Sequence, residues 1–146
     1  MKNLQPIVRR CLRVGLGAAM LLVAGCAGGM SGGMSGATLS GSQEVPPVTT
    51  QASGASTIAV APDKSVTGAV TTTGIVATAA HIHMAAKGQN GPVIVPLSKT
   101  ADNVWSVPAG AKLTDAQYDA YKAGNLYVNV HSAANKGGEI RAQLQP

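Results

Sequence analysis

Hydrophobic and polar residues alternate in short runs from residue 38 to the end of the 146-residue chain. Alternation with a period of two, broken by glycine, proline and asparagine, is typical of short β-strands. Pro96 cannot donate a ladder hydrogen bond, so its strand is expected at an edge or a bulge. The pattern predicts eight strands, over residues 38–43, 54–61, 65–73, 78–84, 93–99, 104–107, 126–132 and 139–144.

Residues 113–124 interrupt this pattern and predict one short helix. Thr114 or Asp115 can cap its N-terminus, and Lys122 suits its last turn. Gly124 fits the position just past the C-terminus. Eight strands and one short helix predict an all-β domain, either a two-sheet Greek-key β-sandwich or a flattened barrel.

The first 25 residues have the features of an export signal. Residues 14–24 are apolar but too short to span a bilayer, which needs about 20 residues. Positive charge precedes them at Lys2, Arg9, Arg10 and Arg13. The sequence Val23-Ala24-Gly25-Cys26 then resembles the lipobox of bacterial lipoproteins. We therefore expect residues 1–25 to be removed and Cys26 to be lipidated; the alternative is an ordinary signal peptide or a short membrane anchor.

Residues 27–36 contain only glycine, serine, alanine and methionine, which is typical of a flexible tether. The predicted organisation is a signal peptide (1–25), a lipidated cysteine with its tether (26–36) and one domain (37–146). Ala27 is not aspartate, which by resemblance to the enterobacterial sorting rule favours the outer membrane. The domain would then face the periplasm or the cell surface.

Charge and cysteine content narrow the function further. The whole chain carries a formal charge of +5, but loss of the four basic residues of the signal leaves seven basic against six acidic side chains. A nearly neutral domain gives no electrostatic reason to expect a nucleic-acid partner. Cys11 leaves with the signal and Cys26 carries lipid, so no disulfide is expected.

All three histidines of the chain fall in two predicted strands. His81 and His83 share one face of the first strand, because side chains alternate along a strand. His131 shares the polar face of the second strand with Tyr127 and Asn129. If the two strands pair, three imidazoles can converge.

Three neutral imidazoles suit one copper or zinc ion. The arrangement resembles the three-histidine sites of β-sheet zinc enzymes such as the carbonic anhydrases. The alternative is three histidines on a solvated face. Glu139 could orient a histidine ring, or pair with Arg141 or Lys136. Met84 could reach the ion if its strand bulges.

Four segments together resemble the CHRD domain family, first noted in chordin and widespread in bacterial exported proteins. They are residues 39–48, residues 80–83 with 90–93, residues 127–132 and residues 137–144. The resemblance implies an immunoglobulin-like or Cu,Zn superoxide-dismutase-like fold, and no settled activity. This chain departs from the family at residues 84–88, where a glycine-rich turn is usual. The matching motif residues are Glu44, His81, His83, Asn129, His131, Glu139 and Arg141.

These observations favour a non-catalytic binding module of a membrane-anchored lipoprotein, holding copper or zinc through His81, His83 and His131. A metal-dependent enzyme is the first alternative, either of the superoxide-dismutase type or a zinc hydrolase with Glu44 or Glu139 as its proton-transfer group. Three histidines are too few for a copper–zinc pair. A purely structural or adhesive domain is the second alternative. The sequence identifies no protein partner.

Overall fold

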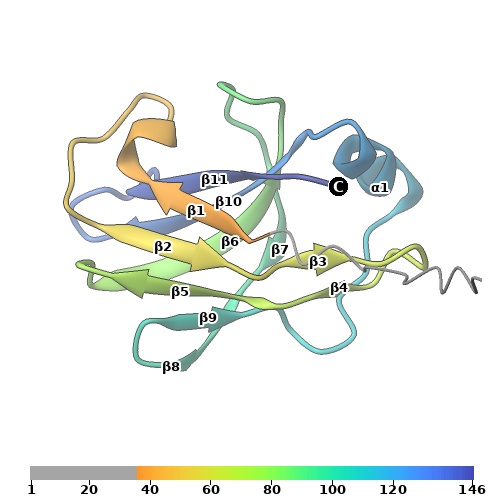
Figure 1. The fold of residues 1–146 in the computed structure, drawn as a ribbon, viewed down its shortest axis with the longest axis horizontal. Coiled ribbons are helices and arrows are strands. Elements are labelled where there is room, and N and C mark those ends of the chain that lie inside the picture. The colour runs from red at the N-terminus through yellow and green to blue at the C-terminus, as the bar shows by residue number, and fades with distance from the viewer. Residues whose placement is uncertain (1–35) are drawn as a thin grey trace, which may run out of the picture. The chain divides into compact units, whose positions relative to one another are not determined.

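The structure is a computed structural model that describes residues 36–146. The predicted signal peptide, Cys26 and the tether as far as Ser35 lie outside the described residues. The described elements, drawn in Figure 1, are β1 (Ala37–Ser40), the 3₁₀ helix η1 (Gly41–Gln43), β2 (Ser53–Ser56), β3 (Ala59–Val60), β4 (Val66–Thr67), β5 (Ala69–Thr73), β6 (Ala77–Met84), β7 (Val93–Pro96), β8 (Ser98–Ala101), β9 (Val104–Ser106), α1 (Asp115–Lys122), β10 (Leu126–Ser132) and β11 (Ile140–Leu144).

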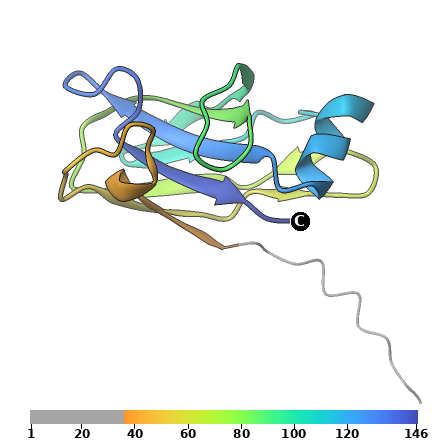
Figure 2. The same ribbon diagram turned by 90° about the horizontal axis from the view of Figure 1, so that it is seen from above.

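Nine of these strands form one antiparallel sheet in the order β7-β6-β10-β11-β1-β2-β5-β9-β8. Its two edge strands, β7 and β8, are separated in sequence by Leu97 alone, whose N–H donates to the Ala80 carbonyl at 2.9 Å. The chain thus passes directly from one edge to the other, and the sheet curls into a nearly closed, flattened barrel (Figures 1 and 2). The predicted all-β class with one short helix is confirmed.

The core fills the inside of this barrel with aliphatic side chains, one tryptophan and one tyrosine. Leu126, Val128 and Val130 of β10 are completely buried and alternate along the strand, as the sequence pattern predicts. Ile82 and Ile140 on the neighbouring strands are buried with them. Trp105 and Tyr121 add two large aromatic rings to this cluster.

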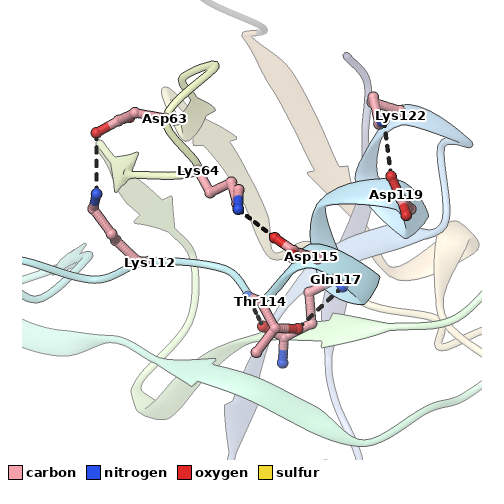
Figure 3. A network of polar contacts seen from close by, with 8 residues as sticks. All are labelled: Asp63, Lys64, Lys112, Thr114, Asp115, Gln117, Asp119 and Lys122. Carbon is pink, nitrogen blue, oxygen red and sulfur yellow. Dashed lines mark hydrogen bonds and ion pairs between the residues drawn. The ribbon is translucent and has the colours of Figure 1, made fainter.

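The helix and the small β3–β4 sheet lie together at one end of the barrel (Figure 1). Thr114 caps α1 as predicted, accepting from the Gln117 N–H while the Gln117 side chain accepts from the Thr114 N–H. An ion pair between Lys64 and Asp115 joins the helix to the loop between β3 and β4 (Figure 3). None of the helices in residues 36–146 has the length and apolar character needed to cross a bilayer.

Four predicted strands are interrupted or shortened in the structure. Residues 65–73 break at Gly68, whose φ of +107° belongs to a backbone region that glycine tolerates. Residues 54–61 break between Ser56 and Ala59, and residues 93–99 divide at Leu97 into the two edge strands. Residues 41–43 form η1 rather than the end of a strand. Pro96 lies in edge strand β7, as expected.

Candidate metal centre

A buried polar layer lies on the outer face of the barrel wall formed by β6, β10 and β11. All seven residues of β10 are buried, so the side chains that point away from the core are covered too. The covering segments are the loops 41–52, 85–92 and 133–138; Figures 1 and 2 show the η1 loop and the β6–β7 loop beside β10 and β11. His83 and His131 are therefore covered rather than solvated, and His81 on β6 is half-buried.

The structure brings the three histidines together. Antiparallel pairing of β6 with β10 sets His81 opposite Asn129, and His83 opposite Tyr127. One nitrogen from each histidine ring can be chosen so that all three lie within 4.8 Å of one another. A tetrahedral zinc ion with Zn–N bonds of 2.0–2.1 Å would separate them by about 3.4 Å. The convergence predicted from strand alternation is present, at a spacing somewhat wider than a bound ion would impose.

Two backbone carbonyls determine which ring nitrogens face the centre. His83 Nδ1 lies 2.9 Å from the Gly91 carbonyl, and His131 Nδ1 lies 2.9 Å from the Lys136 carbonyl. Because a carbonyl oxygen only accepts, both Nδ1 atoms carry a hydrogen, and in the neutral rings both Nε2 atoms offer a lone pair. Metal-bound histidines are usually oriented by this kind of contact.

His81 presents its other nitrogen to the centre. Its Nδ1 lies 3.0 Å from His131 Nε2, which has the lone pair, so His81 Nδ1 donates in this contact. The candidate donor atoms that these contacts indicate are His81 Nδ1, His83 Nε2 and His131 Nε2. Binding an ion at all three requires the His81 hydrogen to leave Nδ1, and its Nε2 can carry that hydrogen instead.

Tyr127 and Arg141 support the ring of His83. The Tyr127 ring stacks on His83 with centroids 4.7 Å apart and an interplanar angle of 8°, and Arg141 Cζ lies 3.4 Å from the Tyr127 centroid. Arg141 also donates to the Gln89 carbonyl at 2.9 Å and to Asn90 Oδ1 at 3.2 Å. Arg141 therefore fixes the loop that carries the Gly91 carbonyl, and acts on the centre without touching the imidazoles.

Glu44 and Asn129 form the side of the layer that lies against Gly138. Both side chains are buried, with exposed fractions of 4% and 2%. A Cβ at Gly138 would lie 2.4 Å from Glu44 Oε1 and 2.6 Å from Asn129 Nδ2. Asn129 Nδ2 donates to the Gly137 carbonyl at 3.4 Å, which directs its Oδ1 elsewhere. Hydrogen-bonding interactions with Asn129 lower the pKa of Glu44 and raise that of His83, although neither contact meets full hydrogen-bond geometry, so Asn129 links the carboxylate to the imidazoles.

Glu139 and Met84 do not lie where the sequence suggested, beside the histidines. Glu139 Oε1 accepts from Thr50 at 2.7 Å and Oε2 accepts from Ser132, so Glu139 neither orients a histidine nor pairs with Arg141 or Lys136. Ser132 and Thr50 lower the pKa of the Glu139 carboxyl. The pairing of β6 with β7 does shift register between Ile82 and His83, yet Met84 packs against the core and away from the histidines.

Burial sets the protonation of the centre. Desolvation lowers the pKa of His81, His83 and His131, and for His81 the two neighbouring imidazoles lower it further. Neutral rings, the form that binds metal ions, are therefore favoured. Desolvation raises the pKa of the Glu44 carboxyl to about 7, although the Arg141 guanidinium acts in the opposite direction.

Three buried acceptors in this layer lack a hydrogen-bond partner: Glu44 Oε1, His83 Nε2 and Asn129 Oδ1. Across residues 36–146, the one other buried side-chain polar atom of this kind is Trp105 Nε1. Buried polar atoms are nearly always hydrogen-bonded. Their concentration beside three converging imidazoles marks this as the candidate functional site of the described domain.

Residues 35–144 match the family model of the CHRD domain. The match covers most of the chain and the whole buried polar layer, and the chain therefore belongs to the CHRD domain family. No curated protein and no solved structure matches the chain.

No role for Tyr127, Gly138 or the carbonyls of Gly91 and Lys136 was predicted from the sequence. The strand pattern could have indicated a role for Tyr127, because this residue shares the polar face of its strand with Asn129 and His131. The glycine pair at 137–138 also stood in the family motif. The carbonyl contacts depend on loop conformation, which no local pattern specified.

We predict that Gly138→Ala destabilises the domain by about 2 kcal/mol or more, from overpacking and backbone strain that each cost about 1–3 kcal/mol. The new methyl group would overlap Glu44 and Asn129, and φ at this position is +134°. Chemical denaturation measures the effect. Gly137→Ala is the matched control, because a Cβ there meets nothing within 4 Å. Equal losses for both variants would refute the packing argument.

A second prediction concerns the pH dependence of stability in Glu44→Gln. Folding raises the Glu44 pKa from 4.5 to about 7, so the folded state binds more protons in that interval and wild-type stability falls as pH rises through it. The amide that replaces the carboxyl in the variant does not titrate. Relative to wild type, the variant should gain stability between pH 4.5 and 8, by of the order of 3 kcal/mol at 1.36 kcal/mol per pKa unit. Denaturation at both pH values measures this gain, and a pH-independent difference would contradict the prediction.

Proposed function

We propose that residues 37–146 form the metal-binding module of a membrane-anchored envelope lipoprotein, and that one copper or zinc ion binds at His81 Nδ1, His83 Nε2 and His131 Nε2. The supporting observation is that His83 and His131 both commit Nδ1 to a backbone carbonyl and direct Nε2 inward. A purely structural layer would have no need to leave the buried His83 Nε2 without a partner.

The donor set limits the kind of ion. Three neutral imidazoles suit zinc and copper, whereas magnesium and calcium prefer oxygen ligands. No cysteine occurs in residues 36–146, and Met84 packs against the core. Soft sulfur ligands that would select Cu(I) therefore do not surround these histidines in the described domain. Cu(II) and Zn(II) are the ions to test.

The non-catalytic interpretation fits the placement of the acidic residues better than the hydrolase does. Glu139, one of two candidates for proton transfer, is held by Thr50 and Ser132. Glu44 remains as the other candidate, and its contact with the imidazoles runs through Asn129. Binding needs only the three imidazoles, so it is the function that the geometry supports best.

We predict that the full chain, purified in detergent without a histidine tag, binds one Cu(II) or Zn(II) per molecule. His83→Ala and His131→Ala should each weaken binding by more than about 100-fold, because outer-shell substitutions alone cost 10–100-fold. Asp102→Ala is the control, since it removes an exposed carboxylate outside the polar layer. Calorimetric titration and metal analysis measure binding. Binding that survives both histidine substitutions would refute the proposal.

The same ion should stabilise the fold. A ligand present at 100 times its Kd stabilises the folded state by about 2.7 kcal/mol, and removal by a chelator should reverse that gain. His83→Ala should show no such response to metal.

The membrane anchor is a separate proposal and needs its own test. Cys26→Ser should abolish incorporation of radiolabelled palmitate and release the protein from the membrane fraction of expressing bacteria, because the thiol is the proposed lipidation site. Cys11→Ser is the matched control, since that residue lies in the proposed signal. Continued membrane association of the Cys26 variant would favour an uncleaved anchor. Fractionation of wild type on a density gradient tests the proposed outer-membrane location.

A further inference from the structure

We infer that the metal centre is open: beside the three imidazoles it has a position for a small exogenous ligand that donates hydrogen bonds, and Asn129 and Glu44 select that ligand. This inference rests on the proposed function and goes beyond it. It concerns what the bound ion itself can hold, and it gives roles to two residues that do not ligate the ion.

The first argument is the chemical type of the atoms without partners. Glu44 Oε1 and Asn129 Oδ1 are both acceptors, and both are buried. The orientation of the Asn129 amide is set, because its Nδ2 donates to the Gly137 carbonyl. When the Glu44 carboxyl is ionised, both atoms are acceptors and require a donor, and leaving either unsatisfied costs about 1–3 kcal/mol.

The second argument is their location. The Asn129 side chain interacts with His83 on one side and Glu44 on the other, and Glu44 Oε1 and Asn129 Nδ2 meet over Gly138. The acceptors therefore line the flank of the layer that adjoins His83 Nε2. A ligand bound to the ion on this flank would meet both.

The third argument is access. Glu44 and Gly138 line a cavity of about 450 Å³ between the loop after η1 and the loop 134–138. Glu44 also lines a second cavity of about 510 Å³ on the side of Arg141 and Gln143. A small molecule can therefore approach the carboxylate from outside the barrel wall.

Water matches these requirements. It can offer one lone pair to the ion and one hydrogen to each of the two acceptors. A small anion without hydrogens, such as azide, would instead meet an amide oxygen and a carboxylate. A metal ion held by three neutral imidazoles would by itself attract anions. Because of the two acceptors, the site should nevertheless discriminate against anions that carry no hydrogen.

The experiment uses the full chain in detergent loaded with Cu(II), with azide as the probe. Water-proton relaxation should be enhanced by the loaded wild type, because a coordinated water exchanges with the solvent. At pH 8, above the Glu44 pKa of about 7, azide, followed by its charge-transfer absorption, should bind at least about tenfold more tightly to Glu44→Gln, where a charge is removed and an amide N–H can donate. Glu139→Gln is the matched control, since both Glu139 oxygens already accept hydrogen bonds.

The outcomes distinguish the open coordination position from the proposed metal binding on which it rests. Stoichiometric Cu(II) binding with enhanced relaxation and a rise in azide affinity confined to Glu44→Gln would support an open, donor-selective centre. Stoichiometric binding without relaxation enhancement would overturn the open position and leave the metal-binding function intact. An equal rise in Glu139→Gln would overturn the role of Glu44. Failure of wild type to bind Cu(II) at all would overturn both.

Discussion

The structure depends on the burial of both faces of the central strand β10. Leu126, Val128 and Val130 face the aliphatic core, and because these side chains are apolar they need no hydrogen-bond partner there. Tyr127, Asn129 and His131 face outward and are buried as well, so each polar group needs a partner inside the protein. The covering loops supply those partners: the Gly91 N–H donates to the Tyr127 hydroxyl, and the Gly137 and Lys136 carbonyls accept from Asn129 and His131. The loops and the polar side chains therefore fix one another.

This mutual dependence explains why residues remote in sequence act together. Arg141 on β11 holds the β6–β7 loop through Gln89 and Asn90, and Asn90 donates to the Val45 carbonyl at 2.7 Å. That bond ties the loop of Glu44 to the loop that orients His83. The remaining unsatisfied acceptors are confined to one flank, between His83 and Glu44. Elsewhere in the layer the buried polar side chains are hydrogen-bonded. The buried atoms that can still accept a hydrogen bond therefore lie together on this flank.

Local periodicity was sufficient to predict some of this and not the rest. Strands β6 and β10 agree with their predicted limits to within a residue, because both alternate strictly and bury one apolar face. The division of residues 93–99 into opposite sheet edges was not predictable, since it depends on how the barrel closes around Leu97. The prediction that the histidines converge depended on one assumption, that β6 pairs with β10. The structure has this pairing. The burial of their face was not predictable, because three loops cover it.

The different roles of the two buried acidic residues could not be predicted from the sequence. Glu44 and Glu139 were equal candidates, since both stood in the family motif and left the apolar pattern. Two hydroxyl donors, from Thr50 and Ser132, complete the hydrogen bonding of Glu139 and lower its pKa. No such donors reach Glu44 Oε1, and burial raises its pKa to about 7. The same side chain is thus a structural acceptor in one loop and a group with remaining binding capacity in another. Hydroxyl groups far away in sequence decide between these roles, so a single chain read along its length could not distinguish them.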